Sequence, residues 1–372
     1  MKSNYRALSE LIEKVDERND DGAITELIGV SIDKCFIKSV ANTNGTDLSK
    51  YKIIRKNEFA VSLMQVSRDS KIPVARLEDY EVAIMSPAYP IFRVKDTRKI
   101  LPEYLDMWFK RPEFDREAAF IAVGGVRGSM PWEEFVKMKL PVPTIEKQLE
   151  IVNSYKAITE RIALMQKIND NLLDSVQAIF RSWFVDYDPF DGVCPSNWET
   201  GCVEDIAEFF DSMRKPLSSL ERTDMERIYP YYGAVSIVDY VDDYIFDGEY
   251  LLVSEDGIYV VDENGHPLIQ HISGKFWANN HAHILKGKSG FNEDSLYLFL
   301  ANTNMAPIVT GAAQPKINQA NLKSFPITIP DSETMLKFNN IIQPFFDQRL
   351  TNESEIKKLE ALQSLLLTRL VD

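Results

Sequence analysis

The chain has 372 residues, of which 45% are hydrophobic, and a formal net charge of −14. This length suffices for two or three domains, each with its own core. The sequence has no run of about 18 apolar residues, so no membrane span is expected. Its polar start lacks an apolar signal core. Three cysteines (Cys35, Cys194, Cys202) do not form a disulfide framework, so we expect a cytoplasmic protein.

The acidic charge is concentrated in the second half of the chain. Residues 191–330 carry 9 basic and 20 acidic side chains, whereas residues 1–143 carry 23 and 22. A protein that binds nucleic acid usually shows a basic footprint. The balance therefore argues against a chain that neutralises DNA phosphates by itself.

Residues 1–143 are predicted to form a mixed α/β domain. The segments YEVAIMS and YPIFRV resemble strands, and LPEYLDMWFKRPEF resembles a helix. SPAY (86–89) is similar to the base-holding motif of amino-methyltransferases, but Ala88 breaks the pattern and no cofactor loop follows a strand. We interpret SPAY as the end of a strand.

Three cations and a serine in this domain are candidate DNA contacts. The loop GGVRGS (124–129) fits neither the phosphate-loop nor the dinucleotide fingerprint. It is either a turn or a place where Arg127 and Ser129 meet phosphate or a base edge, since Arg is the commonest reader of guanine. Arg68 and Lys71 are loop cations that are either solvated or bind DNA.

A long helix is predicted after Pro143, and residues 144–190 are assigned to this helix and a linker. Thr144 is a candidate N-cap, and Glu146 in the first turn suits the helix dipole. Apolar residues recur in steps of three and four, a coiled-coil period. An exposed apolar rod would be insoluble, so we expect a partner helix to cover a stripe that includes Leu149, Tyr155, Ile162, Leu172 and Ile179.

The second half repeats the first at a shift of 187 residues. Gly124 falls on Gly311 and Pro143 on Pro330, without a gap as far as about residue 184. This register predicts a second domain over 191–330 and a second long helix over 331–372, hence a tandem duplication. The expected contact stripe of that helix includes Leu336, Phe345, Leu359 and Leu366, and its polar centre (347–355) either bends or meets a partner.

The second domain offers its own candidate DNA contacts. The loop aligned with GGVRGS is GAAQPKIN (311–318), where Gln314 suits adenine and Lys316 suits phosphate. A metal site is not expected, because His281 and His283 lack further ligands at a recognisable spacing, and Glu255–Asp256 is interpreted as a hairpin turn. The remaining candidates, each with a structural alternative, are Arg214, Lys215, Tyr231, Tyr232, Asn279 and His281.

Two unlike heads on a shared helical spacer suggest a protein that binds two sites at a fixed distance from each other. DNA with two half-sites is the obvious ligand. The chain resembles the specificity subunit of Type I restriction–modification systems along essentially its whole length. The stretches that carry the resemblance are SPAYPIFRV (86–94), residues 124–152, residues 229–257, GKFWANNHAHIL (274–285) and LLLTRL (365–370). The chain departs from the family in its short length and in Met335, which stands where the first copy has Gln148.

The resemblance implies an α+β fold: two tandem α/β target-recognition domains joined by two long antiparallel coiled-coil helices in a pseudo-twofold repeat. It implies that each domain reads half of a bipartite DNA site and that the helices set the spacer. Two methyltransferase subunits would dock, and motor–nuclease subunits would join for restriction. The chain itself would use no cofactor and catalyse nothing. The methyltransferase partners would neutralise most of the phosphates, so we expect the lone chain to bind DNA weakly.

Two other functions stay open from the residues alone. The paired helices could hold protein partners while the heads bind proteins or glycans, as a scaffold does. A stand-alone enzyme is disfavoured, because the sequence shows neither a cofactor loop nor a catalytic constellation.

Overall fold

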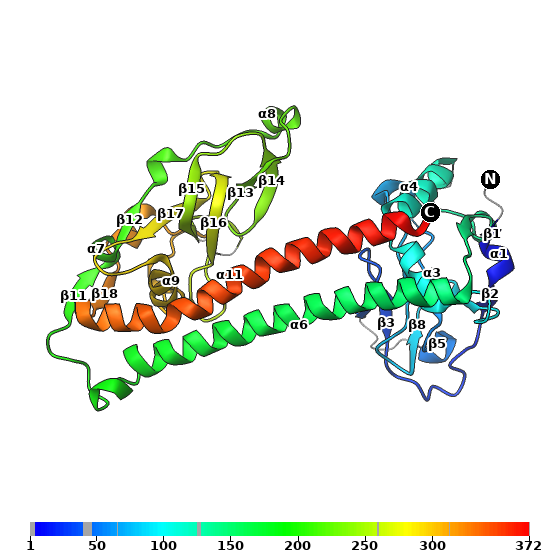
Figure 1. Cartoon of the computed structure of the whole chain (residues 1–372), viewed down its shortest axis with the longest axis horizontal. Coiled ribbons are helices and arrows are strands. Elements are labelled where there is room, and N and C mark those ends of the chain that lie inside the picture. Colours follow the sequence, from blue (N-terminus) through cyan, green and yellow to red (C-terminus); the bar gives the residue numbers. More distant parts are fainter. Residues whose placement is uncertain are drawn as a thin grey trace. The chain divides into compact units, whose positions relative to one another are not determined.

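The structure, a computed structural model, describes residues 4–39, 47–64, 66–124, 128–258, 260–311 and 313–371. Its contacts divide the chain into two units: Met1–Met165 with Glu355–Asp372, and Gln166–Ser354. Each unit holds one head and part of both long helices (Figure 1). We call residues 1–143 the first head and residues 191–330 the second head. The mixture of sheets and long helices confirms the predicted α+β class.

The first head is closed by its own ends. Its first strand, β1 (Tyr5–Ala7), pairs antiparallel with its last, β10 (Lys139–Pro141). Between them lie a four-stranded sheet in the order β2-β9-β6-β7 and the pairs β3–β4 and β5–β8. These strands are β2 (Ile12–Val15), β3 (Ile28–Val30), β4 (Phe36–Lys38), β5 (Lys52–Arg55), β6 (Phe59–Val61), β7 (Val74–Arg76), β8 (Val82–Met85) and β9 (Ile91–Val94).

Short helices cover the central sheet of the first head. The helix α3 (Pro102–Phe109) begins at a proline, whose missing N–H would have no partner in a first turn. Phe59 and Phe92 stack at 5.2 Å between ring centroids, and Phe109 meets both edge-on. The other helices are α1 (Leu8–Leu11), α2 (Val66–Asp69), α4 (Pro112–Ile121) and α5 (Trp132–Phe135), with 3-10 turns η1 (Leu48–Lys50) and η2 (Ala122–Gly124).

The second head repeats this frame around a different sheet. Its first strand, β11 (Glu199–Cys202), pairs antiparallel with its last, β18 (Pro326–Ile329). The six-stranded sheet has the order β12-β17-β15-β16-β13-β14. Its strands are β12 (Ala207–Phe209), β13 (Tyr229–Tyr232), β14 (Ile237–Val241), β15 (Phe246–Ser254), β16 (Ile269–Ala278) and β17 (Ala282–Gly287).

The helices of the second head are short, as in the first. Asn292 caps α9 through its side chain, which accepts a hydrogen bond from the Ser295 amide. The helices are α7 (Val203–Ile206), α8 (Ser219–Thr223), α9 (Glu293–Ala301) and α10 (Gln319–Lys323), with 3-10 turns η5 (Asp211–Met213) and η6 (Ala306–Ile308); the 3-10 turn η4 (Asp188–Phe190) precedes the head.

Within the first unit, the start of α6 (Ile145–Phe184) and the end of α11 (Ser332–Thr368) pack together and onto the first head. Leu367 and Leu370, the latter in the 3-10 turn η7 (Arg369–Val371), share that head's core with Val152. Arg161 pairs with Glu355 at 2.6 Å. The end of the chain therefore completes the hydrophobic core of the first head.

Gln148 fixes the start of α6 to the first head. Its side chain is fully buried; Oε1 accepts from the Leu101 amide, and Nε2 donates to the carbonyls of Lys99 and Pro143, each at 2.9 Å. Met335, at the aligned place in α11, is equally buried but lies among apolar side chains of the second head. One copy of the repeat is thus secured by hydrogen bonds and the other by packing.

Within the second unit, the later part of α6 runs antiparallel to the first part of α11. Phe180 packs against Phe338, with ring centroids 6.4 Å apart. Asn169 and Asn352 are both buried and joined by a 2.7 Å hydrogen bond. The polar centre of α11 therefore meets α6 at Asn352, and α11 continues without a break through Pro344.

The predicted helix-contact residues lie at different depths. Tyr155, Ile179 and Phe345 pack against the cores of their units. Leu149 and Leu336, which occupy aligned places in the repeat, are 44% and 62% exposed. The others, Ile162, Leu172, Leu359 and Leu366, are partly buried. Among the helices of the described residues, none has the length and apolar character needed to cross a bilayer.

Candidate nucleic-acid interface

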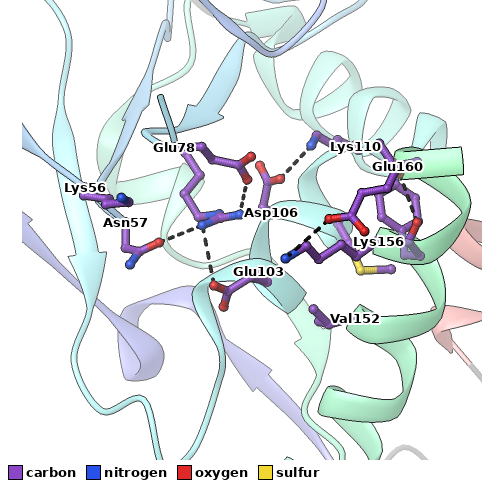
Figure 2. A pocket seen from close by; sticks show the side chains of 13 residues that line it. Lys56, Asn57, Glu78, Glu103, Asp106, Lys110, Val152, Lys156 and Glu160 are labelled. Carbon is purple, nitrogen blue, oxygen red and sulfur yellow. Dashed lines mark hydrogen bonds and ion pairs between the residues drawn. The ribbon is translucent and has the colours of Figure 1, made fainter. Parts of the chain in front are cut away.

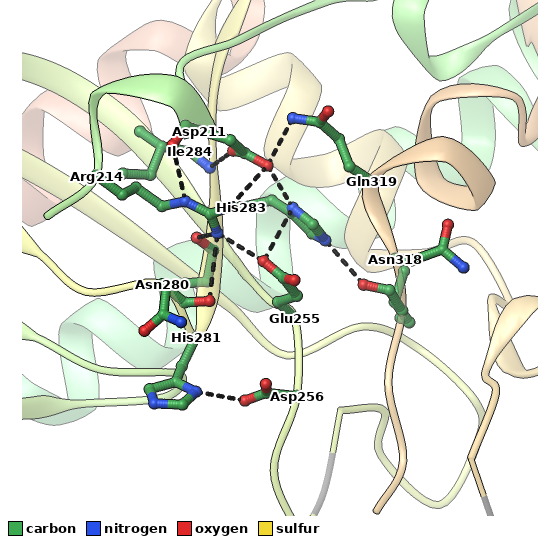
Figure 3. A network of polar contacts seen from close by, with 12 residues as sticks. Asp211, Arg214, Glu255, Asp256, Asn280, His281, His283, Ile284, Asn318 and Gln319 are labelled. Carbon is green, nitrogen blue, oxygen red and sulfur yellow. Dashed lines mark hydrogen bonds and ion pairs between the residues drawn. The ribbon is translucent and has the colours of Figure 1, made fainter. Parts of the chain in front are cut away.

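The loops at one end of the second head are organised around Glu255 (Figure 3). Glu255 follows β15, and its amide donates to the carbonyl of His281 at 2.9 Å, which continues the β15–β17 pairing beyond Ser254 opposite Ala282. Its Oε2 contacts Arg214 at 2.6 Å and its Oε1 contacts Lys316 at 2.8 Å. Two candidate cations from distant segments therefore share one carboxylate.

A second carboxylate lies directly behind this contact. Asp211, in η5, contacts Nδ1 of His283 at 2.7 Å and Arg214 at 3.5 Å. Burial favours a raised pKa for Asp211, but the contacts with His283, the Ile284 amide and Arg214 outweigh it and hold the pKa below its ordinary value. Burial likewise opposes the ionised form of Glu255, and Lys316 and Arg214 hold its pKa low. Both carboxylates are therefore charged at neutral pH.

Asp211, Glu255 and His283 are close enough to suggest metal binding, because their ligand atoms lie within 4.8 Å of one another. However, Arg214 and Lys316 already occupy both oxygens of Glu255. A divalent cation there would be repelled by two positive side chains. The geometry favours a buried network of ion pairs over a metal centre.

The predicted contacts of the second head separate into exposed and buried residues. Arg214 is largely buried, and its Nη1 also donates to the carbonyl of Ala282 at 2.6 Å. Lys316 keeps 44% of its side chain exposed. Gln314, Lys215 and His281 are exposed, and His281 pairs with Asp256 at 2.6 Å.

The remaining three candidates of the second head lie mostly inside the fold. Tyr231 is buried, and its hydroxyl oxygen accepts from the Leu217 amide at 2.9 Å. Tyr232 packs edge-on against Phe276. Asn279 is buried, and its side chain accepts from the His281 amide at 2.8 Å. Among the candidates of this head, Lys316, Gln314, Lys215 and His281 are therefore the ones that keep exposed side chains.

In the first head, Arg127 lies outside the described residues. The adjacent Gly128 has φ +72°, and a Cβ there would come within 2.3 Å of Ser67 Oγ, so Gly128 itself lies tightly against α2. This places the partly buried Ser129 near Arg68, whose side chain is 64% exposed and paired with Asp69. Lys71 is 3.9 Å from Asp33. Within the described residues, the structure thus brings Gly128 next to Ser67 and Arg68 of α2.

A cavity of about 450 Å³ lies in the first unit between the first head and the start of α6 (Figure 2). Arg76 donates to Asn57 at 2.7 Å and pairs with Glu78, and Lys110 pairs with Asp106 at 2.7 Å. Burial favours a lower pKa for Lys110, but Asp106 outweighs it and raises that pKa. The charged lining is paired internally, so we interpret this cavity as part of the seam between head and helix.

Sequence reasoning missed His283 and Asp211 as organisers of the candidate surface. His281 was a candidate DNA contact and His283 was not, and the structure separates the two: β17 begins at Ala282, so His281 lies in the turn and is exposed, while His283 is fully buried. Asp211 gave no signal, because the groups that hydrogen-bond to its carboxylate, on His283, Ile284 and Gln319, are about 70 residues or more away in the chain.

This chain is similar in sequence to a known protein family. A family model described as the Type I restriction modification DNA specificity domain matches residues 195–362. A putative type I restriction enzyme specificity subunit of Haemophilus influenzae is 39% identical over 128 residues, which cover 34% of this chain and 32% of that protein. The MjaIX specificity subunit of Methanocaldococcus jannaschii is 21% identical over 297 residues, 73% of this chain and 68% of that protein.

A solved structure shows the same fold. The S subunit of a Type-I restriction-modification system from M. genitalium aligns over 99% of this chain and 96% of its own, with a TM-score of 0.58 and 15% identity. By contrast, the match to the Haemophilus influenzae protein spans about a third of that protein's length.

Proposed function

We propose that this chain is a specificity subunit of a Type I restriction–modification system, and that it reads a bipartite DNA site for a modification complex without catalysing a reaction itself. In this proposal each head reads one half of the site. The paired segments of α6 and α11 set the spacer between the halves. The domain boundaries are those predicted from the repeat: 1–143, 144–190, 191–330 and 331–372.

The proposal rests on one observation: the two heads have the same closing strand pair and the same following helix, but different sheets between them. Both heads begin and end in an antiparallel strand pair, β1–β10 and β11–β18, and each is followed by a long helix. Inside that frame the sheets differ: one head has a four-stranded sheet with two separate strand pairs, and the other a six-stranded sheet. A duplicated support with unlike loops suits a reader of two different half-sites, since base contacts differ where loops differ.

The charge distribution supports a division of labour with partner subunits. Affinity for DNA comes largely from cations that neutralise phosphates and release counterions. In the second head, Glu255 engages both Arg214 and Lys316. We therefore propose that two methyltransferase subunits dock on this chain and supply most of the phosphate contacts, with motor–nuclease subunits joining for restriction. Because its substrate is the host's DNA, the complex would work in the cytoplasm.

The proposal is tested by exchanging one head at a time. The chain is co-expressed with its modification subunits in a host that lacks DNA methylation, and long-read sequencing reports the methylated motif. We expect a split motif in which replacing the first head changes one half and replacing the second head changes only the other. A chain that supports no split motif, or one whose motif ignores both exchanges, would instead be a scaffold whose heads bind proteins or glycans.

A further inference from the structure

His283 is fully buried, yet both of its ring nitrogens face hydrogen-bond acceptors (Figure 3). Nδ1 lies 2.7 Å from a carboxylate oxygen of Asp211, and Nε2 lies 2.8 Å from the backbone carbonyl of Ile317. A neutral imidazole carries one N–H, so it would leave one nitrogen lone pair against an oxygen. Only the doubly protonated ring satisfies both contacts.

The surroundings of the ring suit a positive charge. Asp211 faces it from η5, and Oε2 of Glu255, from the loop after β15, is 3.6 Å from Nδ1. Of the other charged groups in this network, Arg214 contacts the same Oε2 of Glu255 and also Asp211, and Lys316 contacts Oε1 of Glu255. Two carboxylates and two further cations thus surround the ring, and a buried ion of this kind is tolerated only when it is paired and hydrogen-bonded.

A proton on Asp211 instead of on the ring is disfavoured by the other contacts of that carboxylate. Its Oδ1 accepts from the Ile284 amide at 2.9 Å, and its Oδ2 also accepts from the side-chain amide of Gln319 at 2.7 Å. An ionised carboxylate accepts all these hydrogen bonds at once, whereas a carboxylic acid gives up one acceptor position. The proton therefore resides on His283.

The ring joins three segments that are far apart in the chain. His283 itself is in β17, Asp211 is in η5, and Ile317 ends the loop that carries Gln314 and Lys316. The Ile317 amide donates to the carbonyl of Glu255 at 2.9 Å. The loop is therefore held on both sides of Ile317, directly beneath its exposed residues.

We propose that protonated His283 is a positioning residue for DNA recognition by the second head: it clamps the loop over residues 313–317 onto β17 and so fixes where Lys316 and Gln314 are presented. The inference rests on the proposed function. It makes the reading of the second half-site depend on a buried residue that touches no DNA. Loss of the clamp should loosen the second half-site and leave the first unchanged.

The protonation state is measured on the full chain. The sequence has four histidines, so selective 15N-histidine labelling gives few NMR signals. Because both ring nitrogens face acceptors, we expect one histidine to show two protonated nitrogens, and that signal to vanish in His283→Gln. A neutral tautomer for His283 at pH 7 would overturn the clamp, whatever the DNA experiments show.

The role in recognition is measured on the assembled modification complex. His266→Gln is the matched control, because His266 is partly exposed and pairs with Asp262 in a different hairpin of the same head. We expect His266→Gln to keep the wild-type motif. His283→Gln should lower discrimination at the second half-site by tenfold or more and preserve the first, because glutamine replaces only one of the two donors and lacks the charge.

The outcomes separate the clamp from the proposed function. A wild-type complex without a split motif would overturn the proposed function, and the role of the clamp in DNA reading with it. A wild-type complex that has the motif, together with a His283→Gln complex that keeps both half-sites, would overturn the clamp alone. If His283→Gln does not fold, Asp211→Asn tests the same contact, because it removes the counter-charge of the ring and should loosen the same half-site.

Discussion

Replacing Gln148 by Met, the residue at the aligned place in the second copy, tests how α6 is secured to the first head. The change removes three hydrogen bonds to backbone groups at Leu101, Lys99 and Pro143. At about 1 kcal/mol each, the free energy of unfolding of the first head falls by about 3 kcal/mol. The apolar side chain of Met fits the volume, so we expect destabilisation without loss of the fold.

The assay is hydrogen exchange, which reports on one amide at a time and does not require two-state unfolding of the whole chain. The Leu101 amide donates to Gln148 Oε1. A loss of about 3 kcal/mol corresponds to an exchange rate roughly 100-fold faster at that amide. Amides of the six-stranded sheet in the second head should keep their wild-type rates.

Two variants bracket this prediction. Gln166 is an exposed residue of the same helix, so Gln166→Met should change stability by less than about 0.5 kcal/mol. The reciprocal Met335→Gln buries an amide in an apolar site and should destabilise the second head by about 2–3 kcal/mol. Unchanged protection of the Leu101 amide in Gln148→Met would refute the assigned role of Gln148.

Three further predictions concern buried groups. Burial, with repulsion from Glu249, raises the pKa of Asp294 to about 7. An acid whose pKa is raised in the folded state destabilises the fold as the pH rises from about 4 to 7. Asp294→Asn should therefore add up to about 4 kcal/mol to the free energy of unfolding at pH 8 and little at pH 4. Urea unfolding at the two pH values measures the difference, and an equal gain at both would contradict the assignment. Asn352→Leu alone should cost about 1–3 kcal/mol, because Asn169 loses its buried partner. The double change with Asn169→Leu should recover that cost, and additive effects in the double-mutant cycle would show that the pair is uncoupled. Leu370→Ala should destabilise the first head by about 2–4 kcal/mol, seen as faster exchange of β10 amides; faster exchange confined to the second head would falsify the core assignment of Leu370.

The sequence predicted those parts of the fold that depend on local signals. Pro143 and Pro330 precede the two long helices, and α6 begins at Ile145, one residue after the expected cap. The coiled-coil period in the sequence predicted the extent of the long helices, but it did not predict how deeply each side chain is buried. Leu149 and Leu336 were expected in the helix contact but are exposed. The apolar period could not predict this, because it does not indicate which side of a helix a head will cover.

The sequence could not predict contacts between distant segments. Arg214 was predicted as a candidate DNA contact with a structural alternative, and it is held by Glu255, 41 residues later. The polar centre of the second helix was predicted either to bend or to meet a partner, but the sequence did not identify that partner, because Asn169 is 183 residues away from Asn352. Burial of a polar group depends on whether a partner is present, and single-sequence patterns contain no information about such partners.

The strand pairs that close each head have an evolutionary consequence. Because β1 lies beside β10 and β11 beside β18, each recognition module starts and finishes within one strand spacing, about 4.8 Å. A foreign module with two such strand-forming ends can replace the resident one as a cassette and leave the following helix intact. If each head reads one half-site, as we propose, such an exchange between related genes would change one half of the target sequence and keep the other.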